Sequence, residues 1–117
     1  MIDLVDTIDT IYAEEFDEYK GGLSPRGVRE IKELLVYDRL LQSVKPSEYD
    51  GVIVTHSRNP MELEINFRFA GEVFFSKDNR FKDGQCIITT NVVDIEKARH
   101  EIYVVETENS VYLVIKR

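Results

Sequence analysis

The chain has 117 residues, of which 43% are hydrophobic and 32% charged, and its formal net charge is −7. This length and balance are typical of one folded domain, so we expect a single domain over 1–117, with a helical part (1–45) and a β-sheet part (51–117). The acidity argues against direct binding of nucleic acid, because that affinity comes largely from Lys and Arg side chains that neutralise phosphates.

The sequence also argues against membrane insertion and secretion. No window approaches the roughly 18 consecutive apolar residues that indicate a membrane-spanning helix. The N-terminus has Asp3, Asp6 and Asp9 where a secretory signal has a basic region and an apolar run. The single cysteine, Cys86, cannot form an internal disulfide and fits a reducing compartment. We therefore expect a cytoplasmic protein without membrane contact, and the oligomeric state stays open.

The first predicted element is an amphipathic helix over residues 2–19. Its apolar side chains recur with the period of an α-helix and share one face: Leu4, Val5, Ile8, Ile11, Tyr12, Phe16 and Tyr19. Its acids occupy the opposite side, which we call the acidic face: Asp3, Asp6, Asp9, Glu14, Asp17 and Glu18. One half of the helix is therefore predicted to be buried and the other half to carry a dense negative charge.

One acid breaks this division. Glu15 falls in the apolar sector, where we expect it to reach the rim or to pair with an arginine of the next helix. The helix should then end at Gly21 or Gly22, since glycine readily adopts the left-handed conformation that closes a last turn.

A second helix is predicted from Ser24, which would act as the N-cap, with Pro25 at the first helical position. Its apolar residues before and after Tyr37 lie on two different faces. We therefore expect a break near Tyr37 and a short third helix from Asp38 to about Val44, followed by a turn-rich connector.

From residue 51 the hydrophobic period changes to that of β-strands. The predicted strands are 51–57, 61–69, 72–76, 85–95, 101–107 and 111–117, the last two joined by a tight turn. Segment 61–69 alternates throughout and should have one buried face. The predicted fold class is α+β, with two to three N-terminal helices packed on a five- to six-stranded, mainly antiparallel meander sheet.

Several aromatic residues could mark an interface. Phe74 is out of phase with its neighbours and should point away from the core unless helices cover it, and Tyr103 and Tyr112 could face outward together. Phe81 lies in the polar loop 77–84, where it is interpreted as an anchor, and its exposure stays open.

Catalytic motifs are scarce. The six glycines form no phosphate-binding loop, and two histidines with one cysteine supply no zinc site, so we expect no cofactor and no metal ion. The best catalytic candidate is the loop His56, Ser57, Arg58 and Asn59, in which histidine could be a general base and arginine could hold an acidic group. These are also ordinary turn residues, and we assign no catalytic residue.

Three functions remain open at this point. The leading hypothesis is a small regulatory protein, such as an inhibitor, that presents the acidic face to a basic surface of a partner protein, which could itself bind nucleic acid. An enzyme that uses the loop at 56–59 on a small acidic substrate is the second. The third is a structural domain without a site, whose acids only confer solubility.

Overall fold

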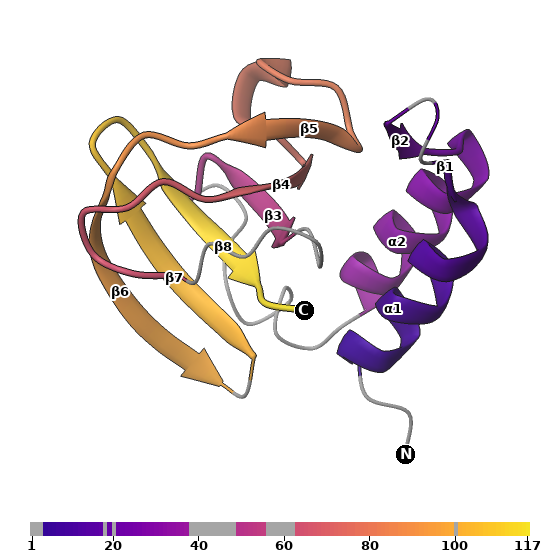
Figure 1. Cartoon of the computed structure of the whole chain (residues 1–117), viewed down its shortest axis with the longest axis horizontal. Helices are drawn as coiled ribbons and strands as arrows, with labels where there is room; N and C mark the ends of the chain where they lie inside the picture. Colours follow the sequence, from indigo (N-terminus) through magenta and orange to yellow (C-terminus); the bar gives the residue numbers. More distant parts are fainter. Residues whose placement is uncertain (1–3, 18, 20, 38–48, 56–62, 100) are drawn as a thin grey trace. The chain divides into compact units, whose positions relative to one another are not determined.

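In a computed structural model of the chain, the described residues are 4–17, 19, 21–37, 49–55, 63–99 and 101–117. They fall in two compact units, Met1–Glu48 and Tyr49–Arg117 (Figure 1). The first unit is mainly helical and the second holds a β-sheet, so the predicted α+β class is confirmed. That the chain is one domain, with the helices packed on the sheet, stays a prediction.

The helical unit is built from two α-helices that lie side by side (Figure 1). Helix α1 spans Leu4–Glu15 and buries Ile8, Ile11 and Tyr12, which confirms its predicted apolar face. Helix α2 spans Pro25–Tyr37. A short hairpin of strands β1 (Phe16–Asp17) and β2 (Gly22–Leu23) connects them.

The first helix is shorter than predicted, because Phe16 leaves it to enter the hairpin. Phe16 pairs with Leu23 in antiparallel register, and the N–H of Gly21 donates to the Asp17 carbonyl at 2.8 Å. Gly21 has φ +70°, so the predicted left-handed glycine is confirmed, although it closes a hairpin turn rather than a helix end. Asp17 is consequently not on the helix.

The start of α2 follows the prediction. Pro25 is its first residue, and the N–H of Gly27 donates to the Ser24 Oγ at 3.1 Å, as an N-cap requires. The described part of the helix ends at Tyr37, and the predicted third helix over 38–44 lies outside the described residues. Within the described ranges there are two α-helices.

The sheet unit has six paired strands in the order β5-β4-β3-β8-β7-β6. Their bounds are β3 Gly51–Thr55, β4 Ala70–Phe74, β5 Gln85–Ile88, β6 Val92–Arg99, β7 Ile102–Thr107 and β8 Val111–Ile115. Four neighbouring pairs are antiparallel, but β3 and β8 are parallel. The sheet is therefore mixed, and the predicted meander is wrong.

Burial explains why the first and last strands of this unit meet at its centre. Residues 51–54 of β3 and 112–115 of β8 are all buried, as in strands covered on both faces. The ladder is closed at one end by Asp50, whose N–H donates to the Val111 carbonyl and whose carboxylate accepts the Val111 N–H, both at 2.8 Å. At the other end the Arg117 N–H donates to the Thr55 Oγ at 2.9 Å.

The predicted strand over 61–69 is wrong in its described part. Residues 63–69 form a bend and a turn, with Asn66 at φ +71°, so the alternation of side chains is interrupted. Phe69 is buried, whereas Ile65 and Phe67 are about half exposed instead of lying on a buried face.

Three of the predicted outward aromatic residues belong to the interior. Tyr112 is buried in the main hydrophobic cluster of the sheet unit, Tyr103 packs against that cluster, and Phe74 is fully buried. The three residues therefore do not form the outward patch that the sequence left open. Phe81 also packs against the cluster, which confirms it as an anchor of its loop, and the Arg80 guanidinium lies 5.1 Å from its ring centroid.

Candidate functional site

The structure divides the acidic face into two groups. Asp6 and Asp9 lie one turn apart on α1, whereas Glu14 and Asp17 flank the junction of α1 with the hairpin. Asp3 and Glu18 lie outside the described residues. Thr10 and Ala13 are the exposed residues between the two groups. The predicted face is thus partly on the helix and partly on the hairpin.

Glu15 behaves differently from the other acids, as predicted. Its carboxylate accepts the Ser24 hydroxyl at 2.5 Å and lies 3.9 Å from the Nε of Arg26 on α2. Gly27 makes this contact possible, because a Cβ there would lie 2.7 Å from the Glu15 Cβ. Glu15 therefore holds the two helices together and does not contribute to the outer negative surface.

Arg26 lies next to Glu15 and Glu30. Its Nε–H donates to a Glu30 carboxylate oxygen at 3.0 Å, one helical turn away. This hydrogen bond, followed by the charges of Glu30 and Glu15, raises the pKa of the guanidinium above its ordinary value. Arg26 thus stays cationic and offsets Glu15 and Glu30.

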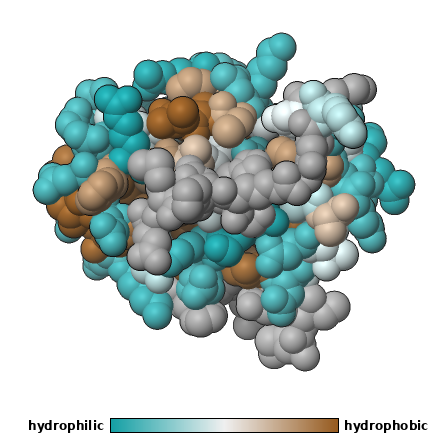
Figure 2. Space-filling model, viewed as in Figure 1, coloured by the Kyte–Doolittle hydropathy of each residue, from teal (hydrophilic) through white to brown (hydrophobic). Residues whose placement is uncertain are grey.

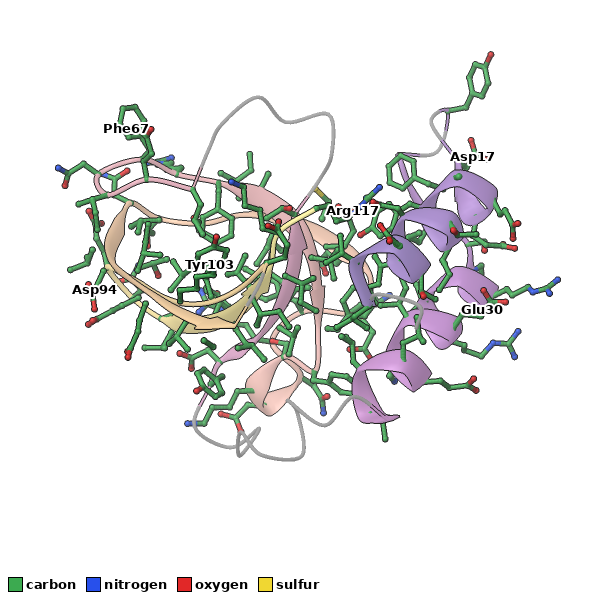
Figure 3. The ribbon with its side chains drawn as sticks, turned by 90° about the horizontal axis from the view of Figure 1, so that it is seen from below. Asp17, Glu30, Phe67, Asp94, Tyr103 and Arg117 are labelled. Atoms are coloured by element: carbon green, nitrogen blue, oxygen red, sulfur yellow. The ribbon has the colours of Figure 1, made fainter. Side chains whose placement is uncertain are left out.

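An open recess of about 510 Å³ lies at the junction of α1 and the hairpin, which we call the hairpin recess. Its lining residues are Glu14, Glu15, Phe16, Asp17, Tyr19 and Ser24. The Phe16 ring stacks on Tyr12, with centroids 5.9 Å apart and an angle of 16° between planes. Tyr19 is fully exposed, and Asp17 lies near one end of the helical unit in Figure 3.

The hairpin recess combines carboxylates with aromatic rings. The Asp17 side chain is oriented by the Tyr19 N–H, which donates to its Oδ1 at 2.9 Å. A guanidinium or ammonium group would be attracted both by carboxylates and by ring faces. The lining therefore suits a cationic side chain better than an anion.

Sequence reasoning missed that Phe16 leaves the helix and that Tyr19 is exposed. Both were placed on the buried side of a long helix, since their spacing continues its apolar pattern. The pair Gly21 and Gly22, together with the short spacing between Phe16 and Leu23, is the signal that could have indicated a hairpin.

Replacing Ser24 with Ala should destabilise the helical unit by about 1 kcal/mol, the usual cost of losing an N-cap. The change removes both the acceptor for the Gly27 N–H and the donor to Glu15. Urea unfolding measures the free energy of unfolding. Ser24→Thr keeps the hydroxyl and should stay close to wild type, so equal stability of Ser24→Ala and wild type would contradict this role.

The other sequence candidates gain no support as sites. The loop His56, Ser57, Arg58 and Asn59 lies outside the described residues. Among the residues that are described, no three His, Cys, Asp or Glu side chains are grouped to hold a metal ion. No helix in the described ranges is long and apolar enough to cross a membrane.

Cys86 is partly exposed on strand β5, directly opposite the buried Glu72 of β4. Partial burial, and then the charge and hydrogen bond of Glu72, raise the pKa of the Cys86 thiol. Because the thiolate is the nucleophile, a raised pKa makes this cysteine slow to react.

Alkylation tests this assignment. At pH 8, iodoacetamide should modify Cys86 several-fold more slowly in the folded protein than in urea, since less of the thiol is ionised. The rate should keep rising with pH beyond the usual thiol pKa of about 8.5. Glu72→Gln removes the neighbouring charge and should accelerate the reaction; an unchanged rate would contradict the role of Glu72.

Comparison with known proteins gives one full-length relative. The chain is 42% identical over 117 residues, covering all of both chains, to an uncharacterized 12.8 kDa protein in the cd-pseT intergenic region of Enterobacteria phage T4. No protein-family model matches the chain. No solved structure matches it either.

Proposed function

The chain belongs to one family with this phage T4 protein, and we propose that it is a small cytoplasmic regulatory protein that binds a basic surface of a partner protein. The contact is made by the acidic face of α1 and the hairpin. The partner is a protein whose surface normally binds nucleic acid, and this chain acts as its inhibitor.

The observation that carries this proposal is the position of the charge. Residues 1–19 contain seven acids and no base, which equals the net charge of the whole chain. Asp6 and Glu14 are exposed, whereas Glu15 lies 3.9 Å from the Nε of Arg26. A concentration of carboxylates speeds association with a cationic surface and disfavours anionic partners.

The hairpin recess adds a place for one specific contact. An Arg or Lys side chain of the partner would enter it between Glu14, Asp17 and the Tyr19 ring. Charge alone supplies attraction over a wide area, whereas a carboxylate-aromatic site fixes the position of one cation. This combination supports a defined complex with one partner rather than general attraction to any basic protein.

Inhibition follows from the chemistry of the surfaces. A protein groove that binds nucleic acid is lined with Lys and Arg, which neutralise phosphates. Carboxylates held by a helix and a hairpin can occupy the same cations, so the two ligands would exclude each other.

Quantitative affinity capture tests the proposal. The tagged full chain and a variant with Asp6→Asn, Asp9→Asn and Glu14→Gln are used as baits in the native cell extract, at low and high salt. The proposal expects a nucleic-acid-binding protein that is retained by the wild type at low salt, lost from the wild type at high salt, and not retained by the variant at either salt concentration. If the wild type and the variant capture the same proteins in equal amounts, the proposal is contradicted.

A further inference from the structure

A second unusual surface lies in the sheet unit, at the end where segment 63–69 runs beside β6. The Asn66 N–H donates to the Val92 carbonyl at 2.8 Å, and the Val92 N–H donates to the Phe67 carbonyl at 2.9 Å. Ile65, Phe67 and Val93 thereby come to the same end of the sheet, with exposed fractions of 45%, 54% and 51%. We call these three residues the sheet-end patch.

The backbone itself holds these side chains outward. Asn66, at φ +71°, turns the chain between Ile65 and Phe67. The pairing of β6 with β7 shifts between Val92 and Asp94, and such bulges redirect a side chain. The Phe67 ring projects away from the ribbon in Figure 3, and hydrophobic atoms reach the surface over this end of the sheet in Figure 2.

More carboxylates than bases border the sheet-end patch, with the exposed Arg68 next to Phe67 as a base among them. Glu64 and Asp94 adjoin it in sequence, Asp94 lies directly opposite Glu106 of β7, and the Glu108 N–H donates to the Asn91 carbonyl at 3.2 Å. All four acids are exposed. Two like charges directly opposite each other weaken a strand pair, so this arrangement does not serve the stability of the sheet.

We propose that the sheet-end patch and its acidic border bind a second partner segment, with apolar side chains at its centre and Lys or Arg residues around them. Charge complementarity selects this occupant. A second copy of the chain would bring the same acids against each other, and like-charge contacts oppose such pairing. The proposal uses residues of the sheet unit only and does not depend on the function of the acidic face.

The test uses two synthetic peptides and the isotope-labelled full chain. One peptide has a Leu-Phe-Leu centre flanked by Lys and Arg, and the other has Glu in place of each basic residue. Titration followed by NMR should shift the backbone amides of residues 64–67 and 92–94 with the basic peptide and leave them in place with the acidic one.

Variants separate this surface from the acidic face. Phe67 is exposed, and Phe67→Ser should weaken binding of the basic peptide about tenfold, as truncation of an aromatic contact does. The dissociation constant is obtained from the shifts of residues 64–67 during the titration. Val93→Thr should also weaken binding of the basic peptide. It replaces Phe67→Ser in the test if circular dichroism shows that Phe67→Ser does not fold. Asp6→Asn with Glu14→Gln should leave this binding unchanged.

Three results would overturn the proposal. They are equal binding of the two peptides, shifts confined to the acidic face of the helical unit, and a concentration-dependent dimer that is abolished by Phe67→Ser. The first would remove charge selection, the second would place the site elsewhere, and the third would make a second copy the occupant.

Discussion

Neutralising three acids of α1 should weaken binding of the partner protein about tenfold. The variant is Asp6→Asn, Asp9→Asn and Glu14→Gln, which keeps side-chain shape and leaves Asp17 to accept the Tyr19 N–H. Exposed ion pairs each contribute modestly, and three together give a loss of about this size. Isothermal titration calorimetry at low salt measures the dissociation constant.

The matched control carries Glu33→Gln, Asp78→Asn and Glu96→Gln, three exposed acids that do not belong to the acidic face. It removes the same three negative charges, so both variants have the same net charge. If the acidic face makes the contact, the control should bind within about twofold of wild type, because exposed charges that do not touch the partner are largely screened by salt. If both variants weakened binding of the partner equally, the loss would depend only on overall charge. That result would contradict a defined binding surface.

Replacing Gly71 with Ala should destabilise the sheet unit by about 1–3 kcal/mol, the usual cost of overpacking. A Cβ at this position of β4 would collide with the Val54 carbonyl oxygen and the Ile53 side chain of β3. Ile53 and Val54 are fully buried in the sheet, so both groups have little room to move. The free energy of unfolding in urea measures the loss.

Gly22→Ala is the control for this prediction. No atom lies within 4 Å of a Cβ built at Gly22, and its φ is not in the left-handed region. The substitution should therefore be neutral or slightly stabilising, since alanine restricts the unfolded chain. If Gly71→Ala were as stable as Gly22→Ala, the close approach of β4 to β3 would be disproved.

Periodicity predicted the parts of the fold that depend on local sequence. The apolar face of α1, the N-cap at Ser24 and the turn between β7 and β8 all follow from side-chain spacing and turn chemistry, and the structure confirms them. The pairing of Glu15 with Arg26 was also predictable, because a carboxylate on a buried face needs a partner.

The errors arise where long-range or turn-specific hydrogen bonds override the period. The apolar spacing of Phe16 and Tyr19 suits a helix, but the hairpin with Leu23 removes both from it. Segment 61–69 alternates like a strand, yet Asn66 turns the chain. The central parallel pair had a signal, since β3 and β8 are continuous apolar runs rather than alternating ones.

The candidate site was predicted in charge but not in shape. The sequence located the acids, whereas the hairpin recess exists only because α1 ends at Glu15 and the chain reverses at Gly21. The exposed Tyr19 could not be inferred from a helical pattern that assigned it to the core. The sheet-end patch was missed for the same reason, because alternation placed Ile65 and Phe67 inside.

Photo-crosslinking from position 19 tests the central claim most directly. Tyr19 is fully exposed beside the hairpin recess, so p-benzoyl-phenylalanine can replace it without disturbing the core. The account predicts an adduct between this position and a Lys- or Arg-rich segment of the partner's nucleic-acid-binding surface, and none from the same probe at the exposed Ala98 of β6. A complex that still forms but yields no adduct from position 19, or yields equal adducts from both positions, would contradict it.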